Sequence, residues 1–338
     1  VSLFLPWQPG CGGGVPWGAA ISIIPWEYYL NYGDVSALAD NYDGMRRHTD
    51  FMTTWLTPEG TMYQQMALFG KTEPFYWFNL GEWGVRKNLP KEELVHTFYL
   101  WMCADITARS AEVLGHKGDA ERYGTLALQT KNAFHKKFYD ADKRSYGDFG
   151  SDVLALTMGV PDTVRAEVVE SLRRQIEVDS DSHLNTGIFG TRYLFSVLVR
   201  NGLADLAYKV LTRRTYPGFG YWIDNGATTM WEFWDGYASH NHPMFGGGLV
   251  WLYRDLAGIN YDVARPGYRH VIVRPVFVNG LETVTYTKAT PFGKVSSTVI
   301  NKIVDKSLEL VIPVGSRATV YLPWSKTPVE IGQGTYRF

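Results

Sequence analysis

Apolar residues recur at helical spacing through the first part of the chain and at every second position near its end. In residues 34–55, for example, Leu38, Tyr42, Met45 and Met52 fall on one face of a helix that Asp34 would cap. The change of period predicts a helical region followed by a smaller region of strands.

Helix boundaries are marked by turn-forming and capping residues. Pro90 and the acidic pair Glu92 and Glu93 open a predicted helix that runs to Leu114, and Gly115 ends it. Similar signals predict helices at residues 19–32, 118–138, 152–158, 162–176, 191–200, 204–213 and 245–257. Short connections between them favour antiparallel helical pairs.

After Tyr261 the apolar positions alternate, and Gly, Pro and Asn separate the alternating runs. The predicted strands are His270–Pro275, Val284–Thr287, Val295–Ile300, Ser307–Ile312 and Ala318–Leu322. We expect a compact antiparallel β domain at residues 263–338, packed on a helical domain at residues 1–262, because so small a sheet is marginal alone.

Composition excludes several classes of partner. The chain of 338 residues has 33 Lys and Arg against 34 Asp and Glu, a net charge of -1, so we expect neither nucleic acid nor an anionic membrane as partner. We find no apolar run of the roughly 18 residues that a transmembrane helix needs. Cys11 and Cys103 lack metal-site spacing and are interpreted as free thiols.

The aromatic fraction of 15%, with 12 Trp and 21 Tyr, fits a carbohydrate-binding protein, because flat rings pack against the C–H faces of sugars. On composition alone, the filling of a large helical core is the favoured interpretation.

The most informative segment is Tyr216–Trp234, which is too rich in Gly and aromatic residues for an ordinary amphipathic helix. It lies between two predicted helices, and we interpret it as a loop. Glu232, flanked by Trp231 and Trp234, could act as a general base on water or accept sugar hydroxyls. It could equally be a buried carboxylate that binds backbone N–H groups.

Other loops add candidate residues. His240 and His242 lie two positions apart, which is poor spacing for a metal pair, and either could bind a sugar hydroxyl or be structural. A Trp stands at the centre of Gly81-Glu82-Trp83 and of Pro16-Trp17-Gly18. Glu82 and Glu232 could form the acid/base pair of a glycosidase, but their separation does not follow from sequence.

Several of these motifs together resemble family 78 of the glycoside hydrolases, the bacterial α-L-rhamnosidases. The run Gly226–Glu232, followed by Asn241-His242 and Phe245-Gly246, is similar to that family's signature. Further similar segments are Pro16–Gly18 with Ile24–Trp26, Leu184–Gly190, Tyr268–Pro275 and Pro291–Gly293. The resemblance covers nearly the whole chain in the family's order.

The resemblance implies an (α/α)6 barrel followed by a β-sandwich, and hydrolysis of terminal α-L-rhamnosyl linkages with inversion at the anomeric carbon. Glu232 corresponds to the general base, and His242 to a substrate-binding histidine. We further expect the sugar to contact Trp17, Glu82, Trp83, His183, Tyr221 and Trp231. The implied partner is a carbohydrate, and we expect no cofactor and no metal.

The chain departs from the family in two respects. The general acid of the family lies in an Asp-Cys-Pro-x-Arg-x-Glu segment that this sequence lacks, and Ala19 stands where the family usually has a sugar-binding Asp. The predicted helices are also too few to close six hairpins. We therefore expect a toroid that is incomplete at its N-terminus, with an N-terminal segment of the same protein completing the barrel.

Two other functions remain open from the residues. A polysaccharide lyase on an α/α toroid would use His240, His242 or Tyr221 to abstract a proton beside a uronate carboxylate. A non-catalytic sugar-binding protein is suggested by Ala19 and by the missing acid segment. We rank the hydrolase first, the binding protein second and the lyase third.

An open barrel would leave apolar helix faces exposed beyond the few hundred Å² that soluble monomers usually tolerate. Residues 1–338 expressed alone should therefore fail to fold stably or should associate. Sedimentation and thermal unfolding test this expectation, and a monodisperse monomer with a sharp transition would contradict it.

Overall fold

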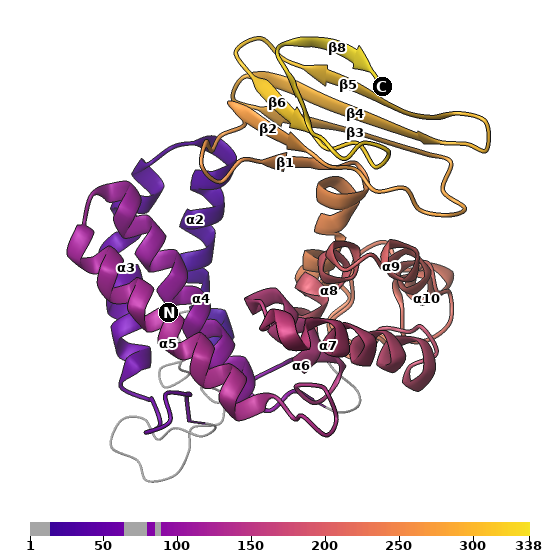
Figure 1. The fold of residues 1–338 in the computed structure, drawn as a ribbon. Coiled ribbons are helices and arrows are strands. Elements are labelled where there is room, and N and C mark those ends of the chain that lie inside the picture. Colours follow the sequence, from indigo (N-terminus) through magenta and orange to yellow (C-terminus); the bar gives the residue numbers. More distant parts are fainter. Residues whose placement is uncertain (1–13, 64–79, 85–88) are drawn as a thin grey trace. The chain divides into compact units, whose positions relative to one another are not determined.

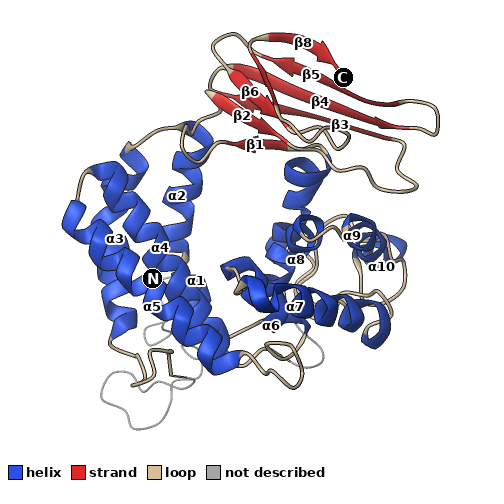
Figure 2. Cartoon of the chain, in the orientation of Figure 1, coloured by secondary structure: helices blue, strands red, loops and turns tan. Residues whose placement is uncertain are grey.

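The computed structural model describes residues 14–63, 80–84 and 89–338. Helices occupy the first part of the chain and strands the last part, as the two colourings of Figures 1 and 2 show. Cys11, one of the two predicted free thiols, lies outside the described residues, while Cys103 is free and buried. Among the described residues, no helix is both long enough and apolar enough to cross a membrane.

The helical elements follow the predicted order. They are α1 (Val15–Gly18), α2 (Ala20–Tyr32), α3 (Ser36–Thr53), α4 (Glu92–Leu114), α5 (Lys117–Phe138), α6 (Phe149–Met158), α7 (Asp162–Arg174), α8 (Ile188–Arg200), α9 (Ala204–Leu211) and α10 (Phe219–Asp224). Shorter helical turns are the π-helix η2 (Gln175–Asp179), the 3-10 helix η3 (Pro243–Val250) and the π-helix η4 (Leu252–Leu256).

Helix α4 shows why sequence signals located these elements well. Glu92 and Glu93 lie in its first turn, where acidic side chains interact favourably with the helix dipole. Gly115 takes a left-handed conformation with φ of 82°, and its N–H bonds the carbonyl of Glu112 at 3.2 Å. The predicted end of this helix is confirmed, because a residue without Cβ adopts that backbone freely.

One local prediction is wrong, because the segment treated as a loop contains the six-residue helix α10. Residues 245–257, predicted as one helix, are helical, but as the 3-10 helix η3 followed by the π-helix η4 and not as a regular α-helix. Gly246, Gly247 and Gly248 follow one another there, and glycine lowers helix stability by about 1 kcal/mol per residue relative to alanine.

The chain divides into two compact units that alternate along the sequence. The first comprises residues 1–26, 36–193 and 212–247, and the second comprises residues 27–35, 194–211 and 248–338. The domain boundary expected after residue 262 stays a prediction.

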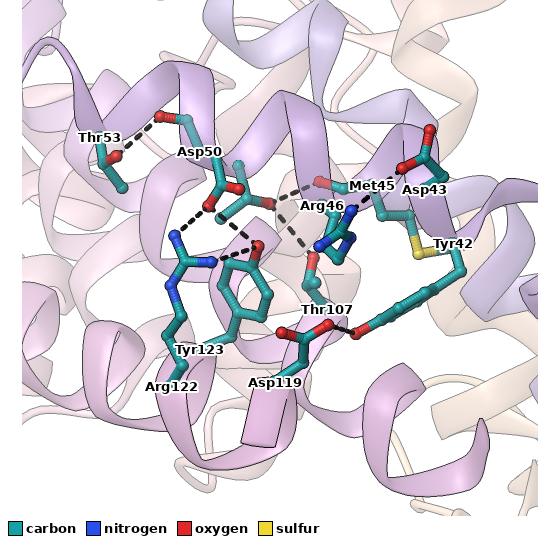
Figure 3. A network of polar contacts seen from close by, with 11 residues as sticks. Tyr42, Asp43, Met45, Arg46, Asp50, Thr53, Thr107, Asp119, Arg122 and Tyr123 are labelled. Atoms are coloured by element: carbon teal, nitrogen blue, oxygen red, sulfur yellow. Dashed lines mark hydrogen bonds and ion pairs between the residues drawn. The ribbon is translucent and has the colours of Figure 1, made fainter. Parts of the chain in front are cut away.

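In the first unit, polar contacts join helices whose apolar faces pack together. Helix α4 packs against α3 and α5. Figure 3 shows the hydroxyl of Tyr42 donating to Asp119 at 2.7 Å, and Tyr123 and Arg122 both donating to Asp50, at 2.9 and 2.7 Å. These contacts fix the register of α3 against α5.

The second unit holds two four-stranded sheets. The first has the order β1 (Ile259–Tyr261), β2 (His270–Val273), β6 (Arg317–Val320) and β7 (Val329–Ile331). The second has the order β3 (Thr283–Thr290), β4 (Gly293–Asn301), β5 (Lys306–Ile312) and β8 (Gly334–Arg337). Strands β2 and β6 pair in parallel, so the prediction of an entirely antiparallel domain is wrong at this pair.

Alternating strand residues build the core of the second unit. Val295, Val299, Leu308 and Leu310 of one sheet and Val271 of the other belong to a single buried cluster. Strand β4 shows the period directly, since Val295, Ser297 and Val299 are buried whereas Ser296 and Thr298 between them are less so. The five predicted strands are confirmed. Strands β1, β7 and β8, which were not predicted, are short and lie at sheet edges.

The buried Tyr123 hydroxyl gives a stability prediction. Tyr123→Phe should lower the free energy of unfolding by about 1–2 kcal/mol, because Asp50 loses a hydrogen bond from a fully buried ring. Tyr139→Phe is the matched control, since its hydroxyl bonds Glu167 at the surface and its loss should change stability by under about 0.5 kcal/mol. Urea unfolding measures both, and equal effects would contradict the expectation.

Candidate active site

The segment around Glu232 folds back on itself. The Glu232 N–H bonds the carbonyl of Ser239 at 2.8 Å, and the His242 N–H bonds the carbonyl of Met230 at 2.8 Å. This pairing places the Glu232 carboxylate 3.4 Å from Nδ1 of His242, and the Ser239 N–H donates to the same carboxylate oxygen at 3.4 Å. The Glu232 side chain is 17% exposed, so its carboxylate meets solvent while its position is held.

A cluster of aromatic rings packs against the segment that carries Glu232. The rings of Trp222 and Trp234 stack at 4.2 Å, Phe245 lies 4.4 Å from Trp234, and the Trp222 indole donates to the carbonyl of Trp234 at 3.1 Å. These large rings bury much apolar surface, and their packing holds the backbone near Glu232 in place.

Trp231 and His240 form a second stack beside Glu232. Their rings lie 4.4 Å apart and nearly parallel, and Nε2 of His240 bonds the carbonyl of Gly236 at 2.7 Å. A donated bond to a carbonyl requires a proton on Nε2. His240 therefore contributes to the shape of the segment, whereas His242 is the histidine that faces Glu232.

Glu82 lies in a different environment. It is 7% exposed, and its carboxylate accepts the N–H groups of Trp83, Phe189 and Gly190 at 3.0, 2.9 and 2.8 Å. Two of these donors lie in the first turn of α8, where a carboxylate interacts favourably with the helix dipole. Burial nevertheless raises the pKa of Glu82 to about 7, and the three N–H donors offset it only in part.

The loop that carries Glu82 is held close to α8. The Ile188 N–H bonds the carbonyl of Trp83 at 2.9 Å, and a Cβ on Gly187 would overlap that carbonyl and the Glu82 side chain. Only glycine allows this approach. On the other side of the loop, His96 of α4 has Nε2 at 3.1 Å from the carbonyl of Leu80.

Further contacts join this loop to Glu232 and to Trp17. Phe233 lies 5.8 Å from the ring of Trp83, and a Cβ on Gly84 would meet Phe245 at 2.9 Å. Trp17 packs edge-on against Phe189 at 5.0 Å. Six predicted residues thus belong to one connected group, called here the Glu232 site: Trp17, Glu82, Trp83, Trp231, Glu232 and His242.

The other two predicted residues lie around a separate cavity of about 400 Å³ in the same unit. His183 lines it, with Nδ1 at 3.0 Å from the carbonyl of Ser180 and Nε2 at 2.7 Å from the Thr215 hydroxyl. Tyr221 packs edge-on against Tyr216, which also lines the cavity. Both ring nitrogens of His183 have protein partners. Sugar contacts by His183 and Tyr221 stay a prediction.

The region of Ala19 is closely packed. Ala19 is fully buried, and a Cβ on Gly18 would meet the ring of His48 at 2.7 Å. Among the described residues, Nε2 of His48 is buried without a hydrogen-bond partner, and burial lowers the pKa of this imidazole to about 4. The imidazole of His48, which packs on Gly18 beside Trp17, is therefore uncharged at neutral pH.

Three contributing residues were not predicted. Ser239 donates to Glu232, while Phe189 and Phe233 pack against the two predicted tryptophans. Phe233 and Phe189 lie in segments already singled out, Tyr216–Trp234 and Leu184–Gly190, and Ser239 directly precedes His240. Within the described part of the chain, no three His, Cys, Asp or Glu residues group as a metal site would require.

Comparison with known proteins identifies the class. Residues 5–256 match the bacterial alpha-L-rhamnosidase 6 hairpin glycosidase domain, and residues 258–337 match the bacterial alpha-L-rhamnosidase C-terminal domain. The chain belongs to the bacterial α-L-rhamnosidase family, and the resemblance read from its motifs is confirmed.

Individual relatives agree with this assignment. An alpha-L-rhamnosidase of Streptomyces avermitilis is 34% identical over 92% of the chain, and one of Formosa agariphila is 30% identical over 91%. The chain spans 30% and 34% of those two proteins, respectively.

Solved structures are similar as well. The alpha-L-rhamnosidase from Dictyoglumus thermophilum has a TM-score of 0.85 at 29% identity, covering 96% of this chain and 39% of that one. The Streptomyces avermitilis alpha-L-rhamnosidase complexed with L-rhamnose has a TM-score of 0.83 at 28% identity, covering 96% of this chain and 33% of its own.

The environment of Glu82 predicts a pH effect on stability. Its pKa is higher in the folded chain than the 4.5 of an exposed Glu, so ionisation costs free energy in the folded state alone. The free energy of unfolding should therefore fall as pH rises from about 4.5 through about 7. Glu82→Gln should show a shallower fall, because the amide does not ionise.

Urea unfolding across that pH range measures the effect. Glu121→Gln, which changes an exposed carboxylate of α5, is the control and should keep the wild-type pH dependence. Parallel curves for wild type and Glu82→Gln would show that Glu82 has an ordinary pKa.

Proposed function

We propose that this chain carries the water-activating and sugar-binding part of an inverting glycoside hydrolase that acts on terminal α-L-rhamnosyl linkages. Glu232 is the general base in this proposal. The observation that carries it is the position of its carboxylate, which is partly exposed, held by the Ser239 N–H and 3.4 Å from His242. The similarity to rhamnosidases over nearly all of the chain supports the same substrate class.

The geometry suits removal of a proton from water. A carboxylate that is fixed but reached by solvent can bind one water molecule and orient it toward the anomeric carbon. His242 lies 3.4 Å from the same carboxylate and can donate a hydrogen bond to a sugar hydroxyl, which would position the sugar ring relative to that water. Trp17, Trp83 and Trp231 offer apolar surfaces for the C–H faces of the sugar.

Glu82 is not the acid partner in this proposal. Its carboxylate already accepts three backbone N–H groups and is almost completely buried, so it is not available to protonate a leaving oxygen. We assign it a positioning role, in which it holds Trp83 and the first turn of α8.

The general acid is proposed to come from another segment of the same protein, since this sequence contains no Asp-Cys-Pro-x-Arg-x-Glu motif. We also propose that the helical part forms one portion of an (α/α)6 toroid and that the two sheets pack as a β-sandwich. The 6 hairpin description of the matched domain and the shared core of the two sheets support these assignments.

Replacing the proposed base should abolish most activity. In the full-length protein, Glu232→Gln should lower kcat for an aryl α-L-rhamnoside by about 10²–10⁴-fold, the usual contribution of a general base. KM should change little, because the amide retains the shape of the side chain. Asp235→Asn, three positions away on the exposed side of the same segment, is the matched control and should retain activity.

Release of the coloured aryl alcohol measures both variants. Full activity of Glu232→Gln would remove Glu232 from the base role. Tight rhamnoside binding by the wild-type protein without turnover would replace the hydrolase proposal with that of a sugar-binding protein.

A further inference from the structure

Residues 233–239 form a loop that folds back on Glu232. At its base, the Glu232 N–H bonds the carbonyl of Ser239 at 2.8 Å, and the Ser239 N–H returns to the Glu232 carboxylate at 3.4 Å. Near its middle, the Gly236 N–H bonds the carbonyl of Phe233 at 3.1 Å and makes a tight turn. The loop belongs to no helix or strand of the described structure, so its shape depends on its own contacts.

Ala238, directly before Ser239, has a backbone conformation that alanine rarely adopts. Its φ is 69°, in the left-handed region, where the Cβ of an L-residue is crowded by a backbone carbonyl. A residue of this kind persists only where surrounding contacts determine its conformation, and such residues gather at functional sites. The conformation of Ala238 sets the direction of the next N–H, which is the one that Ser239 donates to Glu232.

His240 makes contacts that hold this loop in its observed shape. Nε2 of the imidazole bonds the carbonyl of Gly236 at 2.7 Å, and the ring stacks on Trp231 at 4.4 Å. The carbonyl of His240 accepts the hydroxyl of Thr229. One residue therefore joins the middle of the loop to both segments at its base.

Gly236 fits this contact closely. Its φ is 77°, and a Cβ at this position would meet the ring of Trp231 at 2.9 Å and Nε2 of His240 at 3.3 Å. Glycine is therefore required both for the conformation and for the approach of the two rings.

The His240 ring does not act on the carboxylate directly. The histidine in contact with the Glu232 carboxylate is His242, at 3.4 Å, whereas the exposed His240 ring contacts Trp231 and Gly236. The remaining connection from His240 to the carboxylate runs through the loop backbone.

We propose that His240 is a positioning residue for the general base. By fixing the loop, it holds Ala238 in the left-handed conformation and keeps the Ser239 N–H directed at the carboxylate. The inference rests on the proposed function, because it assigns to Glu232 the removal of a proton from water. Without this support, the loop takes a relaxed backbone conformation, and the carboxylate loses the donor that orients it toward the water.

The test uses variants of the full-length protein and an aryl α-L-rhamnoside. His240→Ala should lower kcat about tenfold, since a small displacement of a reacting group costs one to two orders of magnitude in rate. KM should stay within about twofold of the wild-type value, because the ring does not bind the sugar.

A second substitution tests the route of the effect. Adding Ala238→Gly to His240→Ala should restore most of the lost kcat, because glycine adopts a φ of 69° without strain and needs no support from the imidazole. Ala238→Gly alone is the reference for the double variant. His240→Phe, which keeps a stacked ring but loses the bond to Gly236, should have an intermediate kcat and replaces His240→Ala if that variant does not fold.

His116→Ala is the matched control. His116 is also an exposed histidine stacked on an aromatic ring, that of Tyr42 at 4.8 Å, and its loss should leave kcat unchanged. All values of kcat are expressed per folded molecule, with the folded fraction taken from circular dichroism at the assay temperature.

The outcomes separate the two proposals. A rise in KM for His240→Ala without rescue by Ala238→Gly would show that His240 binds the sugar, and an unchanged kcat would limit it to stability. Either result would overturn the positioning role while leaving the hydrolase intact. Absence of rhamnoside hydrolysis by the wild-type protein would overturn the proposed function and the positioning role with it.

Discussion

Burial of the Glu82 carboxylate joins the loop before α4 to the first turn of α8, and the rest of the candidate site is arranged around this contact. Three backbone N–H groups converge on one side chain, and two of them come from residues more than a hundred positions away. The glycine at position 187 lets the two backbones approach. This arrangement positions Trp83 and Phe189, and Phe189 in turn packs against Trp17.

Glu82 and Glu232 show how environment divides one type of side chain between two tasks. Glu82 is surrounded by backbone donors and excluded from water, so its role is to position other groups. Glu232 has one backbone donor at 3.4 Å and a histidine at the same distance, and 17% of its side chain is exposed. A carboxylate that must exchange protons with water needs such access, whereas one that holds a fold together is most effective without it.

Much of the fold follows from local patterns. Gly115 ended a helix where its left-handed conformation was expected, and the alternation in residues 295–300 marked a strand with one buried face. Glu232 and His242 were recognised through a motif that local pairing then brings together. The short strands β7 and β8 were missed because three or four residues at a sheet edge carry almost no periodic signal. The helix expected at residues 245–257 formed, but as 3-10 and π-helix, and the three consecutive glycines there disfavour a regular α-helix.

What sequence could not provide is the set of contacts between distant segments. The sequence left Glu82 open as a catalytic acid, because the donors that occupy its carboxylate lie at residues 189 and 190. The role of Asp152 in α6 was likewise not predictable, since this buried carboxylate accepts hydrogen bonds from Tyr146 and Gln175, which lie on either side of it in the sequence and far from each other. Both cases involve a buried carboxylate that gathers donors from several elements. Because the loss of hydration on burial must be offset by several hydrogen bonds, such a carboxylate needs a particular arrangement of its neighbours. It therefore determines the geometry of the segments that it joins, as Glu82 does for the loop and the helix turn beside the Glu232 site.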